Sequence, residues 1–159
     1  MTREGREGGC ACGEVRYRMT ASPLFVHCCH CRSCQRETGT AFALNALVES
    51  DHVVPVSGSP EAVPTPSESG KGQTIRRCPV CRVAVWSHYG GFGERVSFVR
   101  VGTLDDPDSL SPDVHIYTRS RLPWVRIPDG ATAVEAYYDT KTLWPADSYA
   151  RLMVLFGKR

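Results

Sequence analysis

Cys28-Cys29-His30-Cys31-Arg32-Ser33-Cys34 is the most cysteine-rich segment of the chain and the starting point for its interpretation. Within it, Cys29, Cys31 and Cys34 lie inside six residues, so one loop can offer three thiolates to one metal ion. Thiolates bind Zn(II) at about 2.3 Å, and loops with this spacing bring sulfur atoms close enough to share an ion. The segment therefore predicts a metal site supplied by a single loop.

Two further cysteine motifs lie on either side of this segment. They are Cys10-Ala11-Cys12 near the start of the chain and Cys78-Pro79-Val80-Cys81 in its middle. Four thiolates form a closed tetrahedral site, which suits Zn(II) because this ion is borderline soft and imposes no geometry of its own. We therefore expect a separate four-thiol site that joins the two ends of a sheet.

Spacing alone leaves a different pairing open. A ribbon-type site would combine Cys31 and Cys34 with Cys78 and Cys81, and would leave the first motif over. We favour one site with three thiols and another with four, because a single loop can then supply all three thiols of the first site. This division has a functional consequence, since a closed four-ligand site is structural, whereas three protein ligands with an open fourth position are typical of catalysis.

The fourth position of the three-thiol site decides its role. Cys28, His27 and His30 are the nearby candidates to fill it. In an extended segment Cys28 and Cys29 point to opposite sides, so we interpret Cys28 as a small buried residue. The two histidines stay open as ligands. If the position is open, it can bind an incoming thiol and hold it as the thiolate at neutral pH.

The composition limits the function classes. The 159 residues suffice for one ordinary domain with its own core. Nineteen basic against seventeen acidic residues give a net charge of +2, which argues against nucleic-acid binding. The longest apolar run, residues 152–156, is far too short for a membrane span, and residues 1–9 lack the apolar stretch of a signal peptide. Eight cysteines then indicate metal ligands in a reducing compartment, so we expect a cytoplasmic protein.

Alternating and β-branched residues predict a mainly β fold. Val15, Tyr17 and Met19 alternate with polar residues and indicate a half-buried strand. Further strands are expected over residues 24–28, 41–48 with a continuation to 56, 83–89, 96–101, 114–117 and 133–138. The glycines at 90, 91 and 93 favour a hairpin loop, whereas the proline-rich segment 57–72 is expected to be a turn-rich loop.

Helices are expected to be few and short. One should follow Cys31 and end before Gly39, and one should start at Pro145, after which apolar residues recur at helical spacing up to Phe156. We find no repeat and no second domain. The expectation is a single mainly antiparallel β domain over residues 1–159, with its motifs in residues 8–124 and a C-terminal strand and helix in residues 130–159.

The ordered set of motifs resembles one known family, the glutathione-dependent formaldehyde-activating enzymes, whose eukaryotic relatives include centromere protein V. The resemblance spans roughly Gly8 to Trp124. It rests on Gly9-Cys-Ala-Cys-Gly-Glu-Val-Arg-Tyr17, His27-Cys-Cys-His-Cys-Arg-Ser-Cys34 followed by Gly39, Cys78-Pro-Val-Cys81, and Val101-Gly-Thr-Leu-Asp-Asp106. Any one of these motifs alone would be a weak signal, whereas their order is specific.

The resemblance implies a fold, two cofactor sites and an activity. The fold would be a zinc-stabilised antiparallel β-tent with minor short helices. A structural Zn(II) would be bound by Cys10, Cys12, Cys78 and Cys81, and a second, labile Zn(II) near the active site by the catalytic Cys29, Cys31 and Cys34. The implied activity is a carbon–sulfur lyase reaction, in which formaldehyde condenses with glutathione to S-hydroxymethylglutathione.

One pair of residues departs from the family pattern. Members commonly carry Phe before and Gly after the later Cys-x-x-Cys motif, whereas this chain has Arg77 and Arg82. Zinc knuckles favour Gly at the second position because it adopts a left-handed turn freely. Arginine there should be tolerated at some cost in stability, and the substrate pocket can differ from that of the type enzyme.

Glutathione has two carboxylates, which need cationic or backbone partners. Arg32, Arg36 and Lys71 are the candidate substrate-binding residues, and the alternative for each is a solvated surface charge. We hypothesise that the glutathione sulfur occupies the open position of the three-thiol site as a thiolate.

Other polar residues have a structural and a catalytic interpretation. His88 on an expected strand can be a proton shuttle, although a satisfied structural histidine is more common. Asp105 and Asp106 precede a proline, which is typical of turns.

Two other functions fit the same motifs. One is a non-catalytic, zinc-stabilised binding or adaptor module. The other is a redox or zinc sensor that uses the cysteine-rich loop as a switch.

Overall fold

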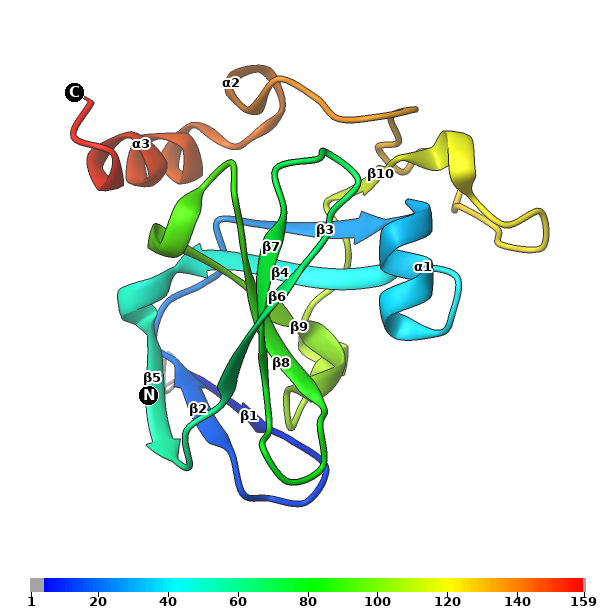
Figure 1. Cartoon of the computed structure of the whole chain (residues 1–159). Coiled ribbons are helices and arrows are strands. Elements are labelled where there is room, and N and C mark those ends of the chain that lie inside the picture. Colours follow the sequence, from blue (N-terminus) through cyan, green and yellow to red (C-terminus); the bar gives the residue numbers. More distant parts are fainter. Residues whose placement is uncertain (1–4, 159) are drawn as a thin grey trace.

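The computed structural model describes residues 5–158 of the chain. Residues 1–4 and 159 lie outside it; the expected N-terminal segment (residues 1–9) and the expected domain (residues 1–159) both include some of them. The described residues form two sheets (Figure 1). In the smaller one β1 (Arg6–Gly9), β2 (Arg16–Met19) and β5 (Val53–Ser57) pair antiparallel. The larger one has the order β10 (Val114–Ile116), β3 (Phe25–Cys29), β4 (Ala43–Glu49), β9 (Val96–Arg100), β8 (Ala84–Tyr89), β7 (Gln73–Arg77) and β6 (Glu61–Thr65).

Short helices complete the fold. They are α1 (Arg32–Thr38), α2 (Thr140–Leu143) and α3 (Ala146–Leu155), with 3-10 turns η1 (Ser50–His52), η2 (Gly93–Arg95), η3 (Val101–Thr103), η4 (Pro107–Ser109) and η5 (Thr118–Ser120). In Figure 1, α1 follows β3 at one end of the large sheet, and α2 and α3 lie together on the side of the molecule opposite the small sheet.

The first core lies between the two sheets. Tyr17 and Met19 of β2 are fully buried, and the Tyr17 ring packs edge-on against Trp86 of β8 at 5.6 Å between ring centroids. The Tyr17 hydroxyl shares a 2.7 Å hydrogen bond with Thr103 Oγ1. A Cβ at Gly8 would lie 2.6 Å from the Tyr17 hydroxyl oxygen, so a glycine is required where β1 passes this ring.

The second core lies under the C-terminal helices. The Phe25 ring stacks on Trp144 at 5.5 Å, and Leu152 of α3 is buried beside them. Burying a side chain of this size contributes about 2 kcal/mol, which is enough to dock a short helix. Arg151 of α3 also donates to the carboxylate of Glu49 at the end of β4. The two tyrosines that precede α2 also pack on β3, with Tyr138 against Phe25 and Tyr137 against His27.

The mainly β fold, the helix after Cys31 and the terminal helix are confirmed, as is the β8–β9 pair around the glycines. The expected strand from 41 to 56 is wrong as one element. The 3-10 turn η1 interrupts it, and the chain passes there from β4 in the large sheet to β5 in the small one.

Two other expectations are corrected. The segment 57–72 is not entirely loop, because β6 forms in it as an edge strand, where prolines are tolerated. The strand expected at 133–138 is reduced to an isolated bridge at Ala133, because Tyr117 takes a left-handed φ of 54° and ends the neighbouring β10. The mainly antiparallel pairing is as expected, with β10 pairing parallel to β3 at one end of the large sheet.

Among residues 5–158, no helix has both the length and the apolar character that crossing a membrane would require.

Candidate metal centres and the adjoining cavity

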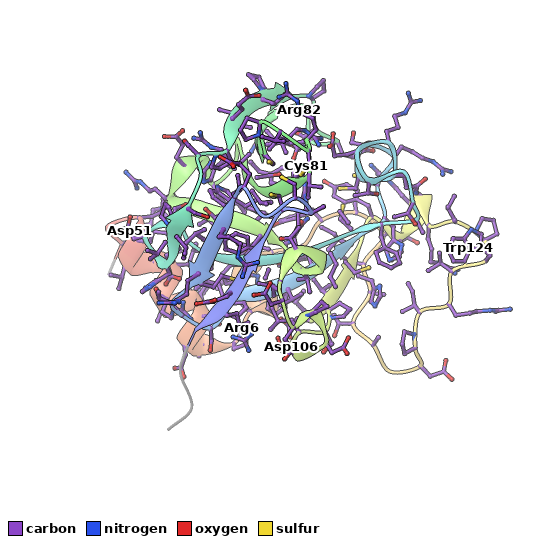
Figure 2. All side chains as sticks on the ribbon, turned by 90° about the horizontal axis from the view of Figure 1, so that it is seen from below. Arg6, Asp51, Cys81, Arg82, Asp106 and Trp124 are labelled. Atoms are coloured by element: carbon purple, nitrogen blue, oxygen red, sulfur yellow. The ribbon has the colours of Figure 1, made fainter. Side chains whose placement is uncertain are left out.

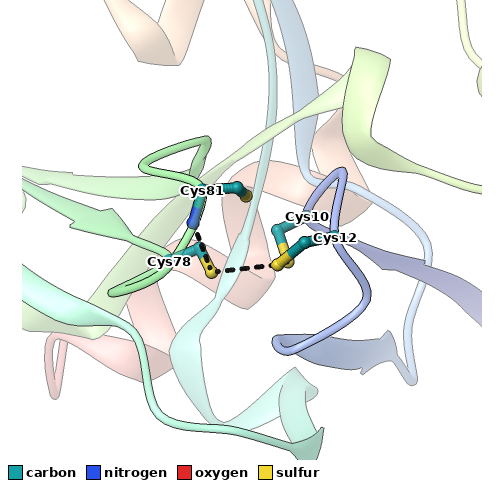
Figure 3. A group of neighbouring side chains, drawn as sticks. All are labelled: Cys10, Cys12, Cys78 and Cys81. Carbon is teal, nitrogen blue, oxygen red and sulfur yellow. Dashed lines mark hydrogen bonds between the residues drawn. The ribbon is translucent and has the colours of Figure 1, made fainter.

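Cys10, Cys12, Cys78 and Cys81 converge in one group, which we call the four-thiol cluster (Figure 3). The first two follow β1, and the other two form the turn between β7 and β8. The Cys10 and Cys12 sulfurs lie 3.5 Å apart, and those of Cys12 and Cys78 lie 3.7 Å apart. The cluster therefore joins the small sheet to the large one.

These positions fit a zinc ion. A tetrahedron with 2.3 Å zinc–sulfur bonds has edges of about 3.8 Å, close to the separations observed. Backbone amides also point at the sulfurs: Val15 N donates to Cys10 Sγ at 3.3 Å, and Val80 N to Cys78 Sγ at 3.4 Å. Such bonds favour thiolate over thiol. The donor set is thus suited to hold zinc as a closed, structural site.

Arg82 has an unusual conformation in the knuckle that carries Cys78 and Cys81. The φ of Arg82 is 66°, the left-handed conformation for which glycine is preferred, and the Arg82 amide donates to the Cys78 carbonyl at 3.1 Å. The Arg82 side chain pairs with Glu61. Figure 2 shows Cys81 and Arg82 together at the edge of the molecule. The expected left-handed turn is therefore present, with an arginine in it.

Cys29, Cys31 and Cys34 form a second group, the three-thiol cluster, with their sulfurs within 4.8 Å of one another. Cys29 ends β3, Cys31 is the N-cap residue of α1, and Cys34 lies in the helix. The Cys34 amide donates to Cys31 Sγ at 3.3 Å. All three side chains are buried, and all three border a cavity.

The three thiols differ in acidity. Hydrogen bonds from the Cys29 and Cys34 thiols, with help from the Cys34 backbone amide, lower the pKa of Cys31 despite its burial. Interactions with the Cys31 and Cys34 thiols, followed by burial, raise the pKa of Cys29. Cys31 is therefore the sulfur that carries negative charge first. The donor set could hold a metal ion, because three soft sulfurs at this spacing suit Zn(II).

The cavity beside the three-thiol cluster has a volume of about 420 Å³. Aromatic side chains form much of its wall: Tyr89, Phe92, Phe98, Tyr117 and Tyr137. Burial raises the pKa of Tyr137 to about 12, so its hydroxyl stays neutral at pH 7. The cavity is thus an apolar space with a thiolate-bearing end, the arrangement expected of a small-molecule site.

His27 forms part of the cavity wall and is held from behind. Its Nε2 atom shares a 2.5 Å hydrogen bond with the Tyr138 hydroxyl, which also accepts a 2.7 Å bond from Trp144 Nε1. Burial lowers the pKa of His27 to about 3, so the ring is neutral at pH 7.

The candidate substrate-binding residues lie in two places. Lys71 borders the cavity, whereas Arg32 and Arg36 stand on α1 beside a separate shallow groove near Trp124. Trp124 projects at the edge of the molecule and is 69% exposed (Figure 2).

The other candidates lie outside the cavity lining. His88 bonds to Ser97 Oγ at 3.0 Å, and Asp105 binds the Arg16 guanidinium, so both have structural partners.

Sequence reasoning missed the aromatic wall and one further group of donors. The wall residues come from separate strands and loops, so no local pattern marks them. The further donors are Cys28, His30 and His115, whose ligand atoms lie within 4.8 Å of one another. The adjacency of Cys28 and His30 to the cysteine-rich loop was a visible signal, but His115 is 85 residues further along the chain than His30.

One of three comparisons with known proteins agrees with the motifs. The sequence model of the family described as glutathione-dependent formaldehyde-activating enzyme matches residues 5–120. Among solved structures, a crystal structure of a Rhodobacter sphaeroides protein is similar, with 17% sequence identity and a TM-score of 0.46, over 67% of this chain and 91% of that one. A search of curated protein sequences gave no match.

Proposed function

This chain belongs to the glutathione-dependent formaldehyde-activating enzyme family, and on this premise we propose that it is a zinc-dependent carbon–sulfur lyase. It would condense formaldehyde, or another small aldehyde, with glutathione or a similar thiol. The observation that supports this most directly is the three-thiol cluster, which supplies three donors and borders a cavity of about 420 Å³. The four-thiol cluster has the donor number of a structural site instead.

The reaction needs a thiolate and a carbonyl group. The sulfur lone pair adds to the carbonyl carbon, a carbon–sulfur bond forms, and the carbonyl π electrons move to oxygen, which then takes a proton. Free thiols have a pKa near 8.5, so most glutathione is protonated at pH 7. Zinc bound by Cys29, Cys31 and Cys34 would favour the ionised form of a thiol at its open position.

The chain's own residues would position the reactants. The aromatic wall excludes water from the reacting atoms, and the bond from Tyr138 fixes the ring of His27 in that wall. Lys71 is our first choice as partner of a substrate carboxylate, because it borders the same cavity as the thiols. For Arg32 and Arg36, substrate binding stays a prediction. Sites built on thiolates need reduced sulfur, which supports the proposed cytoplasmic location.

The test is the rate of exchange between formaldehyde and its glutathione adduct, measured by ¹³C exchange NMR with zinc present and the uncatalysed rate subtracted. We expect Cys31→Ser to lower the catalysed rate by more than about 100-fold, since even residues behind a ligand cost 10–100-fold. Val154→Ser, at an exposed position of α3, is the control. A zinc-loaded wild type that does not exceed the uncatalysed rate would contradict the lyase and leave the adaptor function.

A further inference from the structure

The strand that carries Cys29, and the extended residues that follow it, present a second donor set on the other face. Side chains alternate along an extended chain, so Cys29 and Cys31 lie on one side and Cys28 and His30 on the opposite one. The cavity is bordered by the first pair and by neither residue of the second. The sequence Cys28-Cys29-His30-Cys31 therefore contributes donor side chains to two different places in the molecule.

The parallel pairing of β10 with β3 adds a third donor. His115 is the Cα partner of Cys28 in this register, so the two side chains stand next to each other on one face. His30 N donates to the Ile116 carbonyl at 3.0 Å, which continues the pairing beyond the end of β3. Strand register alone thus brings together Cys28, His30 and His115, which we call the mixed cluster.

The distances within the mixed cluster match those of a coordination sphere. Cys28 Sγ lies 3.6 Å from His30 Nε2, which in turn lies 3.0 Å from His115 Nδ1. For tetrahedral zinc, bonds of 2.3 Å to sulfur and about 2.05 Å to nitrogen imply separations of about 3.6 Å and 3.3 Å respectively. The sulfur–nitrogen distance fits without change, and the nitrogen–nitrogen distance needs a shift of a few tenths of an ångström.

The surroundings direct these donors toward one another. Cys28 is 2% exposed, His30 0% and His115 8%. The Nδ1 atom of His30 is buried with no hydrogen-bond partner among residues 5–158, so the polar contacts of this ring lie on its Nε2 side. Two imidazole nitrogens at 3.0 Å must share either a proton or an ion.

We propose that Cys28, His30 and His115 form a third metal site, for a borderline divalent ion of the zinc class, on the face of β3 away from the cavity. One thiolate and two imidazoles are donors that such ions prefer. The ion would tie β10 to β3. These two strands pair over only three residues each and are far apart in the sequence. It would thereby hold the end of β10, where Tyr117 enters the cavity wall. This proposal does not depend on the lyase activity.

Zinc content under reducing, zinc-replete conditions tests the site. After equilibrium dialysis we expect three zinc ions per wild-type chain, and one fewer in His115→Gln and in Cys28→Ala. His52→Gln, in η1, is the matched control and should keep all three. Cys28→Ala is included because it places a small apolar side chain at a buried position and tests the site if His115→Gln does not fold by circular dichroism.

The histidine tautomers give a second measurement. Unlike the zinc count, it does not depend on how completely the three-thiol cluster is filled. Coordination through Nε2 leaves the proton of His30 on Nδ1, and coordination through Nδ1 leaves that of His115 on Nε2. Long-range ¹H–¹⁵N spectra should show these two tautomers with zinc, and a change at both rings after chelation. A zinc content that neither Cys28→Ala nor His115→Gln lowers, or imidazole signals that zinc does not move, would overturn the proposal in favour of a metal-free hydrogen-bonded cluster.

Discussion

The four-thiol cluster and the three-thiol cluster differ in where their sulfurs originate. Cys12 and Cys78 are 66 residues apart in the chain and come from different sheets, so an ion between them holds tertiary structure together. Cys29, Cys31 and Cys34 belong to one strand end and the helix that follows it. Local donors can lose their ion without separating any elements, so the chain can place a labile ion there and still remain folded.

The largest effect should follow from breaking the four-thiol cluster. Cys78→Ser removes one of four thiolates, and we expect the free energy of unfolding in zinc buffer to fall by about 4 kcal/mol, because metal binding is part of the folding free energy. Urea denaturation at fixed free zinc measures it. Val80→Ala, an exposed residue of the same knuckle, is the control. A loss below about 1 kcal/mol would mean that the cluster does not hold the sheets together.

Acid should act on the cavity side of the molecule through His27. Burial lowers its pKa to about 3, so the unfolded chain binds a proton below pH 6.5 and the folded chain does not. The contribution of His27 is complete above pH 6.5 and is lost as pH falls toward 3. From pH 7 to pH 5 it should cost about 2 kcal/mol of unfolding free energy. Between pH 7 and pH 5, the unfolding free energy of His27→Gln should therefore fall by about 2 kcal/mol less than that of the wild type. Equal losses in the two proteins would contradict the assignment to His27.

An ion pair connects the two clusters. Arg77, which directly precedes Cys78, pairs with Glu37 in α1, the helix that carries Cys34, and both side chains are mostly buried. A double-mutant cycle with Arg77→Met and Glu37→Gln should give a coupling of about 1 kcal/mol in unfolding. Additive effects of the two substitutions would show that this ion pair does not couple the clusters.

The three-thiol cluster should tolerate the loss of a ligand. In Cys31→Ser the new hydroxyl can still accept from the Cys34 amide, because serine is a good N-cap residue. We therefore expect a change below about 1 kcal/mol in unfolding, together with loss of the more weakly bound zinc in a titration with chelators of graded affinity. A loss as large as that of Cys78→Ser would erase the distinction between the clusters.

Local sequence patterns predicted the features that depend on residues close together in the chain. Spacing favoured the division into the two thiol clusters but left the ribbon-type pairing open, and turn signals placed α1 between Cys31 and Gly39. The alternation of Tyr17 and Met19 identified β2 because one face of that strand is buried. The assignment of Cys29, Cys31 and Cys34 to catalysis stays a prediction, as does the single domain.

Pairing between distant segments could not be predicted in the same way. Nothing near Val114 shows that β10 will lie parallel to β3, whose sequence ends 85 residues earlier. Pro64 argued against a strand, but it occurs in β6 at the sheet edge, where a missing amide costs no ladder bond. The cavity wall has the same origin, since Tyr89 and Tyr137 meet only after the sheet and the C-terminal segment have packed.

The smallest effect concerns the strain in the four-thiol cluster. Arg82 has a φ of 66°, and a left-handed conformation costs a residue with a Cβ about 1–2 kcal/mol, whereas glycine loses about 0.5–1 kcal/mol through the greater freedom of its unfolded chain. Arg82→Gly should therefore raise the unfolding free energy by about 0.5 kcal/mol. Arg82→Ala is the control, because it also loses the exposed pair with Glu61 but keeps the Cβ. If glycine is no more stable than alanine at this position, the knuckle stores no backbone strain, and arginine fits there as well as the glycine common in the family.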